Sequence, residues 1–212
     1  MTDYETEEQR VEAIRKWWAE NGTSIILGAL LGIGLLLGWR GWVYWKQKTA
    51  EEASDHYARL VQAVADAELE SAEREAGLLK VDYGSTPYAA VAALALARLE
   101  AQQGALDKAA AELQWVLDNA TQETARQVAR LRLARVRTAQ QRPDEALALL
   151  EDLPEAYMAL VEEARGDALL SKGDRDGARA AYDRALAAAG RTVDYLQWKR
   201  DDLGDPPQVA GE

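Results

Sequence analysis

The chain has 212 residues, no cysteine and one histidine, and its 36 acidic against 25 basic residues give a formal net charge of −11. The absence of cysteine excludes disulfides and thiolate chemistry, and with a single histidine, metal sites built from nitrogen and sulfur ligands are excluded too. An acidic chain does not suit general nucleic-acid binding, which needs a basic surface to release counterions. Composition therefore predicts no nucleic-acid partner, no metal and no cofactor.

The charges are divided unevenly along the chain. The first 48 residues carry six acidic and six basic groups, so residues 49–212 carry all of the net charge. Such a charge keeps a domain soluble, and about 160 residues suffice for one substantial core. We expect a short N-terminal segment over 1–20, a membrane helix over 21–46, a helical domain over 47–204 and a disordered tail over 205–212.

The first strong element is an apolar run. From Asn21 to Trp39 no residue carries a formal charge, and a helix of that run covers roughly 28 Å, close to the ~30 Å hydrocarbon core of a bilayer. A cleaved signal peptide and a buried core helix are the alternatives. The acidic start "TDYETEE" and the large aromatics after the run argue against a signal peptide. An uncleaved single-pass anchor is predicted, with an interfacial belt at headgroup level made of Trp39, Arg40, Trp42, Tyr44 and Trp45.

Four glycines divide the anchor into two faces. Gly28 and Gly32 share one face, and Gly34 and Gly38 share another that is roughly opposite. Each pair has the spacing that lets a second helix approach closely in lipid. The pairs are therefore candidate packing sites, although glycines also occur in anchors as passive lipid-facing residues.

The remainder of the chain reads as helix throughout. It is dominated by Ala, Leu, Glu, Arg and Gln, and apolar residues recur at spacings of three and four. Residues 49–70 are expected to continue the anchor helix, and 72–82 to form a short partner. The segment "TVDYLQWKRDDLG" is expected to cap the last core through Tyr195, Leu196, Trp198 and Leu203. Breakers separate the runs at 83–87, 102–104, 140–144, 171–177 and 187–192.

Internal repeats account for the regular spacing of these breaker segments. Segments beginning at Ala90, Gln127 and Ala159 align with small residues at the eighth and twentieth places, a bulky apolar residue at the twenty-fourth, and a polar turn between. Small residues let two antiparallel helices cross closely, and the bulky residue packs into the next pair. The matching residues are Ala97, Ala134 and Gly166, then Ala109, Ala146 and Ala178, then Leu113, Leu150 and Tyr182.

This pattern resembles the tetratricopeptide repeat, a helix-turn-helix unit of about 34 residues. The third copy, "GDALLSKGDRDGARAAYDRAL", matches best, whereas Glu100 and Arg137 stand where a large apolar residue is usual. Starts 37 and 32 residues apart also depart from a strict period. The expected fold is all-α: one membrane helix, a tetratricopeptide-like solenoid and a C-terminal capping helix. An Ala-rich bundle with coincidental spacing is the alternative.

The repeat resemblance also implies a partner groove lined by the first helix of each repeat. Arg98 and Arg135 occupy equivalent places there, where arginine can hold a carboxylate in a two-pronged contact. They are equally suited to pair with Asp167 and Glu163 along the groove, and the run "RQVARLRLARVR" also reads as solvated helix edges. The inward places are Val91, Leu94, Arg98 and Ala101, then Val128, Leu131, Arg135 and Thr138, then Leu160, Glu163, Asp167 and Leu170.

Five segments in order extend the resemblance to the whole chain: "VEAIRKWWAENG", a glycine-spaced anchor ending "GWRGW", "YGSTPYAAVAALALA", "LRLARV" and "GDALLSKGDRDGARAAY". Together they resemble the YfgM family, the ancillary subunit of the bacterial SecYEG translocon. The resemblance implies an inner-membrane protein with a cytoplasmic N-terminus and a periplasmic repeat domain. It implies SecYEG, the periplasmic chaperone PpiD and translocating or unfolded clients as partners. Charge alone does not orient the anchor, because three basic residues flank it on each side.

No enzyme signature stands out. His56, the one histidine, lies on an expected helix, where a packing or solvated role is usual, and neighbouring carboxylates such as Glu162 and Glu163 point in different directions on a helix. We expect a non-enzymatic interaction protein in the lipid bilayer that helps pass newly translocated proteins to periplasmic chaperones. The alternative is a single-pass scaffold whose cytoplasmic tail holds a stress-response regulatory protein.

Overall fold

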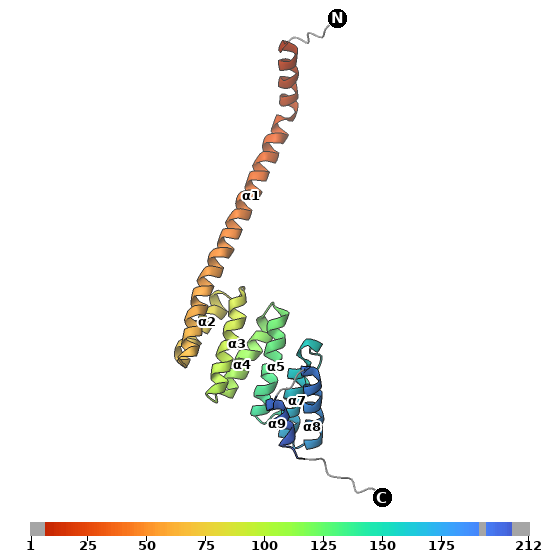
Figure 1. Cartoon of the computed structure of the whole chain (residues 1–212). Helices are drawn as coiled ribbons and strands as arrows, with labels where there is room; N and C mark the ends of the chain where they lie inside the picture. The colour runs from red at the N-terminus through yellow and green to blue at the C-terminus, as the bar shows by residue number, and fades with distance from the viewer. Residues whose placement is uncertain (1–6, 191–193, 205–212) are drawn as a thin grey trace. The chain divides into compact units, whose positions relative to one another are not determined.

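A computed structural model describes residues 7–190 and 194–204 of the chain. Over these residues it contains helices and no strand, which confirms the expected all-α class. The tail expected to be disordered, residues 205–212, lies outside the described residues, as do residues 1–6. Figure 1 shows the elements: α1 (Glu7–Ala65), α2 (Leu69–Asp82), α3 (Pro87–Gln102), α4 (Leu106–Asn119), α5 (Glu123–Ala139), α6 (Pro143–Leu149), the 3-10 turn η1 (Glu155–Tyr157), α7 (Met158–Lys172), α8 (Arg175–Ala189) and α9 (Asp194–Asp201).

The chain divides into two compact units, Met1–Ala50 and Glu51–Glu212. The first unit is the N-terminal part of α1. Its apolar run is exposed on all sides, as Leu30, Leu35 and Leu36 show with exposed fractions of 61%, 75% and 68%. Among the described residues, α1 is the one helix that is long and apolar enough to cross a membrane. Within the described residues, 6% of its most apolar window is buried, so this run lacks the burial of a soluble core helix.

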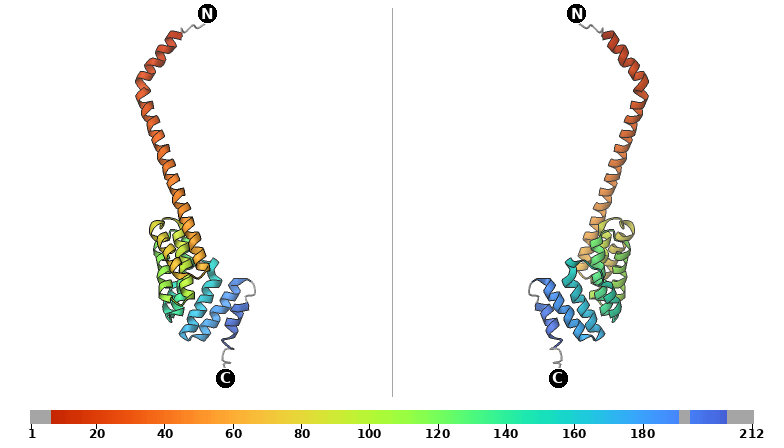
Figure 2. Two further views of the ribbon diagram at one scale, coloured as in Figure 1. Left: turned by 90° about the vertical axis from the view of Figure 1, so that its left-hand side faces the viewer. Right: turned by 90° about the vertical axis from the view of Figure 1, so that its right-hand side faces the viewer.

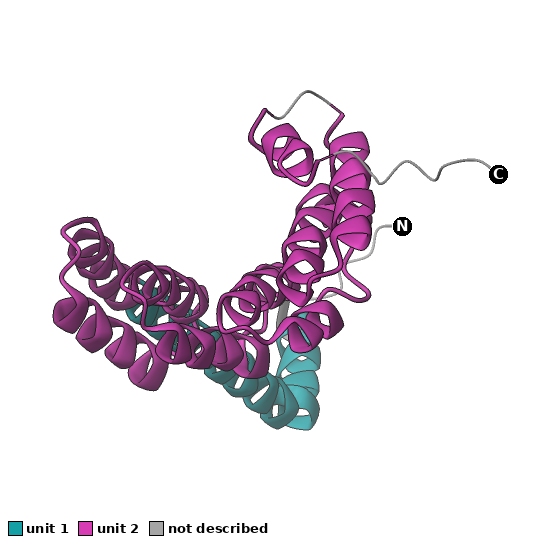
Figure 3. Cartoon of the chain, turned by 90° about the horizontal axis from the view of Figure 1, so that it is seen from below, with its two compact units in different colours: residues 1–50 teal, residues 51–212 magenta. Residues whose placement is uncertain are grey.

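The second unit is a row of antiparallel helix pairs, which Figure 3 shows as a curved succession. Its helices end close to the expected breakers: α2 ends at Asp82, α3 at Gln102, α5 at Ala139 and α7 at Lys172. Two further connections, over 120–122 and 150–157, contain no glycine and were not predicted. The helix that continues the anchor ends at Ala65, ahead of the expected residue 70.

The repeat alignment is confirmed by burial. Every small residue at the eighth and twentieth places is buried, and the bulky residues at the twenty-fourth place are at most 1% exposed. These residues sit where α3 meets α4, α5 meets α6 and α7 meets α8. The buried side chains fall into four separate clusters along the row rather than one central core. Each cluster is closed by neighbouring helices, which is the organisation of a solenoid.

The capping helix forms, but only half of its expected residues cover the core. Leu196 and Leu203 are buried against Ala178, Tyr182 and Ala185. The expectation for Tyr195 and Trp198 was wrong, because their exposed fractions are 47% and 71%. A helix turns by about 100° per residue, so side chains one place before and two places after Leu196 point away from the face that Leu196 buries.

Candidate functional site

The predicted groove residues lie on the first helices of the three repeats, α3, α5 and α7. Some of them pack inside the domain rather than facing outward: Leu94, Leu131 and Glu163 are at most 8% exposed. Others remain accessible, since Val91, Leu160 and Leu170 are each more than a third exposed. Val128 and Asp167 are half-buried, and Arg98 and Arg135 are exposed.

A cavity of about 480 Å³ opens between α3 and α5. It brings together Arg98 and Arg135, the two arginines that were predicted to share a groove, and adds Arg132 to them. Val91, Leu94, Val128 and Leu131 do not line it. The cavity has an apolar floor of Ala97, Ala101, Leu113 and Val136 and a polar rim of Gln102 and three arginines, Arg98, Arg132 and Arg135.

Positive charge accumulates at this cavity without full neutralisation. Burial lowers the pKa of Arg132, and the nearby charges of Arg98 and Arg135 lower it further. Arg132 Nη1 donates to the backbone carbonyl of Leu94 at 3.2 Å. Over residues 7–190 and 194–204, neither Arg98 nor Arg132 forms an ion pair with an acidic side chain. Three cations around one hollow favour an anionic ligand, and guanidinium groups bind carboxylates or phosphates through two parallel hydrogen bonds.

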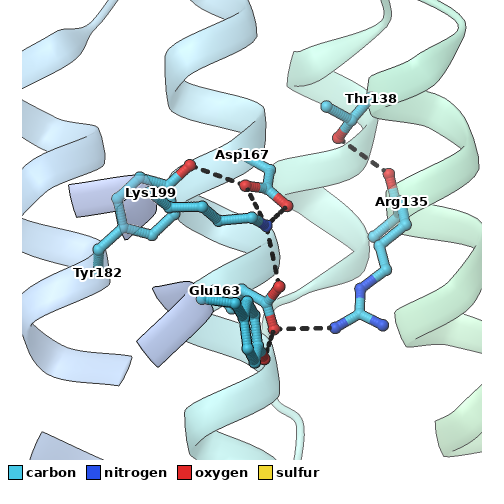
Figure 4. A network of polar contacts seen from close by, with 8 residues as sticks. Arg135, Thr138, Glu163, Asp167, Tyr182 and Lys199 are labelled. Atoms are coloured by element: carbon cyan, nitrogen blue, oxygen red, sulfur yellow. Dashed lines mark hydrogen bonds and ion pairs between the residues drawn. The ribbon is translucent and has the colours of Figure 1, made fainter. Parts of the chain in front are cut away.

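The third repeat presents the opposite charge, and the chain covers it with its own C-terminal helix. Lys199 on α9 donates to Glu163 Oε1 at 2.9 Å and to Asp167 at 2.8 and 2.9 Å, as Figure 4 shows. Tyr182 donates to Asp167 at 2.7 Å, and Tyr195 donates to Glu163 at 3.0 Å. The two groove carboxylates are thus satisfied inside the chain.

Arg98 and Arg135 were expected to pair with Asp167 and Glu163, and in the structure Arg135 makes such a contact, with Glu163. Arg135 Nη2 lies 3.4 Å from Glu163 Oε2, which is a long contact, and the Arg135 side chain remains 40% exposed. Asp167 pairs with Lys199. Burial alone would lower the pKa of Lys199, but its hydrogen bonds to Asp167 and Glu163 outweigh burial and raise it. The acidic end of the groove is closed by these bonds, whereas the arginine cavity stays available.

The anchor glycines show where a second helix has room. A methyl carbon added to Gly28, Gly32, Gly34 or Gly38 would meet no atom within 4 Å. A shallow hollow of about 730 Å³ runs along one side of α1, with Gly34 and Gly38 in its lining and Gly28 and Gly32 outside it. The hollow is bordered by apolar side chains: Leu27, Leu30, Leu31, Leu35, Trp39 and Trp42.

The predicted belt follows this hollow along α1. The rings of Trp39 and Trp42 lie 5.3 Å apart, and Lys46 Nζ stands 4.6 Å from the ring centre of Trp42. Arg40, Tyr44 and Trp45 are exposed on the same stretch of helix. Tryptophan and lysine stacked in this way are typical of a membrane–water boundary.

Groups with possible chemistry elsewhere have structural partners. His56 Nδ1 lies 2.7 Å from Glu75 Oε2 and 2.8 Å from an Arg59 nitrogen. Within the described ranges no cluster of three His, Cys, Asp or Glu side chains is placed to hold a metal. The geometry of the arginine cavity supports binding through charge and apolar surface.

The roles of two residues, Arg132 and Glu100, were not predicted from the sequence. Arg132 stood in the arginine run, but its position on the cavity rim depends on how α5 packs against α3. Glu100 was noted only as a departure from the repeat pattern; it is 2% exposed, and its Oε2 has no hydrogen-bond partner. Burial raises the pKa of Glu100 to about 7, with help from the charges of Glu112 and Glu73.

Comparison with known proteins covers almost the whole chain. A family profile described as a tetratricopeptide repeat-like domain matches residues 15–205. The chain is 40% identical over 190 residues to the ancillary SecYEG translocon subunit of Escherichia coli (strain K12), covering 88% of this chain and 90% of the relative. The protein of the same name from Haemophilus influenzae is 28% identical, and the match covers 84% of this chain and 88% of that relative. The one from Neisseria gonorrhoeae is 27% identical, and the match covers 96% of this chain and 100% of that relative.

Proposed function

Since the chain belongs to the tetratricopeptide repeat-like family and is similar over most of its length to proteins named ancillary SecYEG translocon subunit, we propose that it is a non-enzymatic, membrane-anchored protein of the Sec translocon. The observation that carries the proposal is the 40% identity, because it extends over 88% of the chain. A helical-repeat array supports binding rather than catalysis, since such arrays offer extended surfaces to partners.

The proposed location is the bacterial inner membrane, with a single span, a cytoplasmic N-terminus and a periplasmic repeat domain. The exposed apolar run of α1 and its aromatic belt support an anchor. The orientation is carried over from the family resemblance.

Within this role, the repeat domain passes newly translocated proteins to periplasmic chaperones, with PpiD as a direct partner. The cavity with Arg98, Arg132 and Arg135 supports a binding surface for acidic or carboxylate-bearing segments. Its apolar floor suits the side chains next to such a carboxylate. A client in an extended state presents both features.

Crosslinking followed by co-purification from membranes tests the proposal. The intact chain, a form without residues 2–20 and a form without residues 51–212 are compared. We expect translocon and chaperone to be recovered with the intact chain and with the tail-deleted form, and chaperone to be lost with the domain. Partner loss only on deletion of residues 2–20 would favour the cytoplasmic scaffold instead.

A further inference from the structure

The first turns of α1, ahead of the apolar run, carry a row of large apolar side chains that are each more than half exposed among the described residues. Val11, Ile14, Trp17 and Trp18 are 59%, 66%, 54% and 51% exposed. Soluble proteins seldom leave two neighbouring tryptophans in water without a partner surface. This row precedes the uncharged run, so the membrane span does not account for its exposed apolar side chains.

These four residues share one face of the helix. At about 100° per residue they fall within an arc of roughly 120°, and Glu12, Lys16 and Glu20 lie on the opposite side. Arg15 stands roughly 40° outside the apolar arc, whereas Arg10, one turn before Ile14 at the start of the segment, falls inside it near the edge marked by Trp17. A helix with two such faces is built to lie at a boundary between water and an apolar phase.

Local packing marks a bend between this face and the span. Figure 2 shows α1 changing direction below its dark red first turns. The pair Asn21–Gly22 stands at the start of the uncharged run, and Asn21 Nδ2 donates to the carbonyl of Trp17 at 3.0 Å. The ring of Trp18 covers Gly22 so closely that an added methyl carbon would lie 3.2 Å from Trp18 Cε2. Glycine here leaves room for the ring and for the change of direction.

We propose that residues 9–20 form an amphipathic helix that lies on the surface of the same bilayer that the following run crosses. This inference rests on the proposed membrane anchor. The apolar face meets the acyl chains just below the headgroups, and the face with Glu12, Lys16 and Glu20 stays in water. Arg15 reaches phosphates from the edge of the apolar face, and Arg10, on that face at the start of the segment, extends its long side chain up to the headgroups.

A lipid surface is favoured over a protein partner because the segment is joined to the span without a linker. The covalent connection holds its apolar face at a very high local concentration next to the membrane, so even weak attraction suffices. Tryptophan is also the residue that prefers this depth in the bilayer.

The chain has no cysteine, so single cysteines introduced into the full-length protein report position without background. Nitroxide labels at Ile14→Cys, Glu12→Cys and Leu31→Cys are compared in nanodiscs of phosphatidylethanolamine and phosphatidylglycerol. Accessibility to oxygen reports lipid, and accessibility to a water-soluble nickel chelate reports solvent. We expect a several-fold higher oxygen-to-nickel ratio at position 14 than at position 12, with position 31 in lipid. Trp17→Asp with Trp18→Asp should move the label at position 14 into water.

Other results overturn the inference in distinguishable ways. Equal water exposure at positions 12 and 14, with position 31 in lipid, removes the surface helix and leaves the anchor intact. A label at position 14 that is shielded from both reagents shows a protein partner or a second copy in place of lipid. Water exposure at position 31 removes the anchor and the surface helix together.

Discussion

Gly166 on α7 lies directly against the ring of Tyr182 on α8. A methyl carbon on Gly166 would fall within 3.0 Å of three ring carbons of Tyr182. The ring has little freedom to move, because Tyr182 is 1% exposed and its hydroxyl donates to Asp167. The two helices of the third repeat therefore approach at a distance that a β-carbon at residue 166 forbids.

We expect Gly166→Ala to lower the free energy of unfolding by about 1–3 kcal/mol through overpacking. The measurement is the thermal midpoint of the detergent-solubilised chain. Gly77→Ala is the matched control, because its added methyl meets no atom within 4 Å, so it should be neutral or stabilising. A change in the thermal midpoint for Gly166→Ala as small as the change for Gly77→Ala would contradict the close approach of α7 and α8.

The buried Glu100 makes stability depend on pH. Its pKa of about 7 in the folded chain lies above the ordinary 4.5, so folding favours the protonated form and ionisation opposes folding. The penalty is absent below the ordinary pKa, grows as the pH rises towards the folded pKa, and is complete above it. Glu100→Leu should therefore stabilise the chain by about 1–3 kcal/mol at pH 8 and by less at pH 5.

Thermal midpoints at the two pH values provide the measurement. Glu145→Leu serves as the control, since Glu145 is an exposed acid that pairs with Arg137 at 3.3 Å and its charge is not among those that raise the pKa of Glu100. An equal gain for Glu100→Leu at pH 5 and pH 8 would show that ionisation is not the cause.

The orientation of the anchor is open to a protease test. Protease added to spheroplasts with a permeabilised outer membrane should digest the chain after Lys48 and leave residues 1–20 protected. A long C-terminal domain can be exported regardless of its charge. Resistance of residues 51–212 in intact spheroplasts would place the domain in the cytoplasm and remove the periplasmic role.

The arginine cavity is tested by charge reversal. Arg98→Glu with Arg135→Glu should weaken binding of chaperone and unfolded client by roughly tenfold or more, because each lost charged contact is worth ~1.5–3 kcal/mol. Arg130→Glu, on the same helix but outside the cavity lining, is the control. An unchanged thermal midpoint with unchanged binding in the double variant would move the binding surface to the convex face or to α9 around Trp198.

Glycine replacement tests the two faces of the anchor. Leucines at Gly34 and Gly38 would fill the apolar hollow along α1, and we expect them to reduce recovery of membrane partners while insertion stays normal. Leucines at Gly28 and Gly32 test the opposite face in the same way. Equal recovery for both replacements and the original chain would leave all four glycines as lipid-facing residues.

Local pattern was enough to predict the repeats but not the site. Ala97, Ala134 and Gly166 were identified because small residues at a helix crossing recur at a fixed distance along the chain. The bond between Lys199 and Glu163 joins residues 36 apart, and it depends on α9 packing against α8 so that its side chains reach α7, which no periodicity encodes. Arg132 belongs to the cavity for a similar reason, since its place depends on the packing of α5 against α3.

The four separate clusters of buried residues have a mechanical consequence. A force applied to the C-terminal end acts first on the cluster of Ala178, Tyr182 and Leu196. The buried residues of the described helices are divided among four clusters, so the force is not distributed over one common core. Helix pairs joined only to their neighbours yield one after another, so the domain lengthens in steps and refolds from whichever pairs remain.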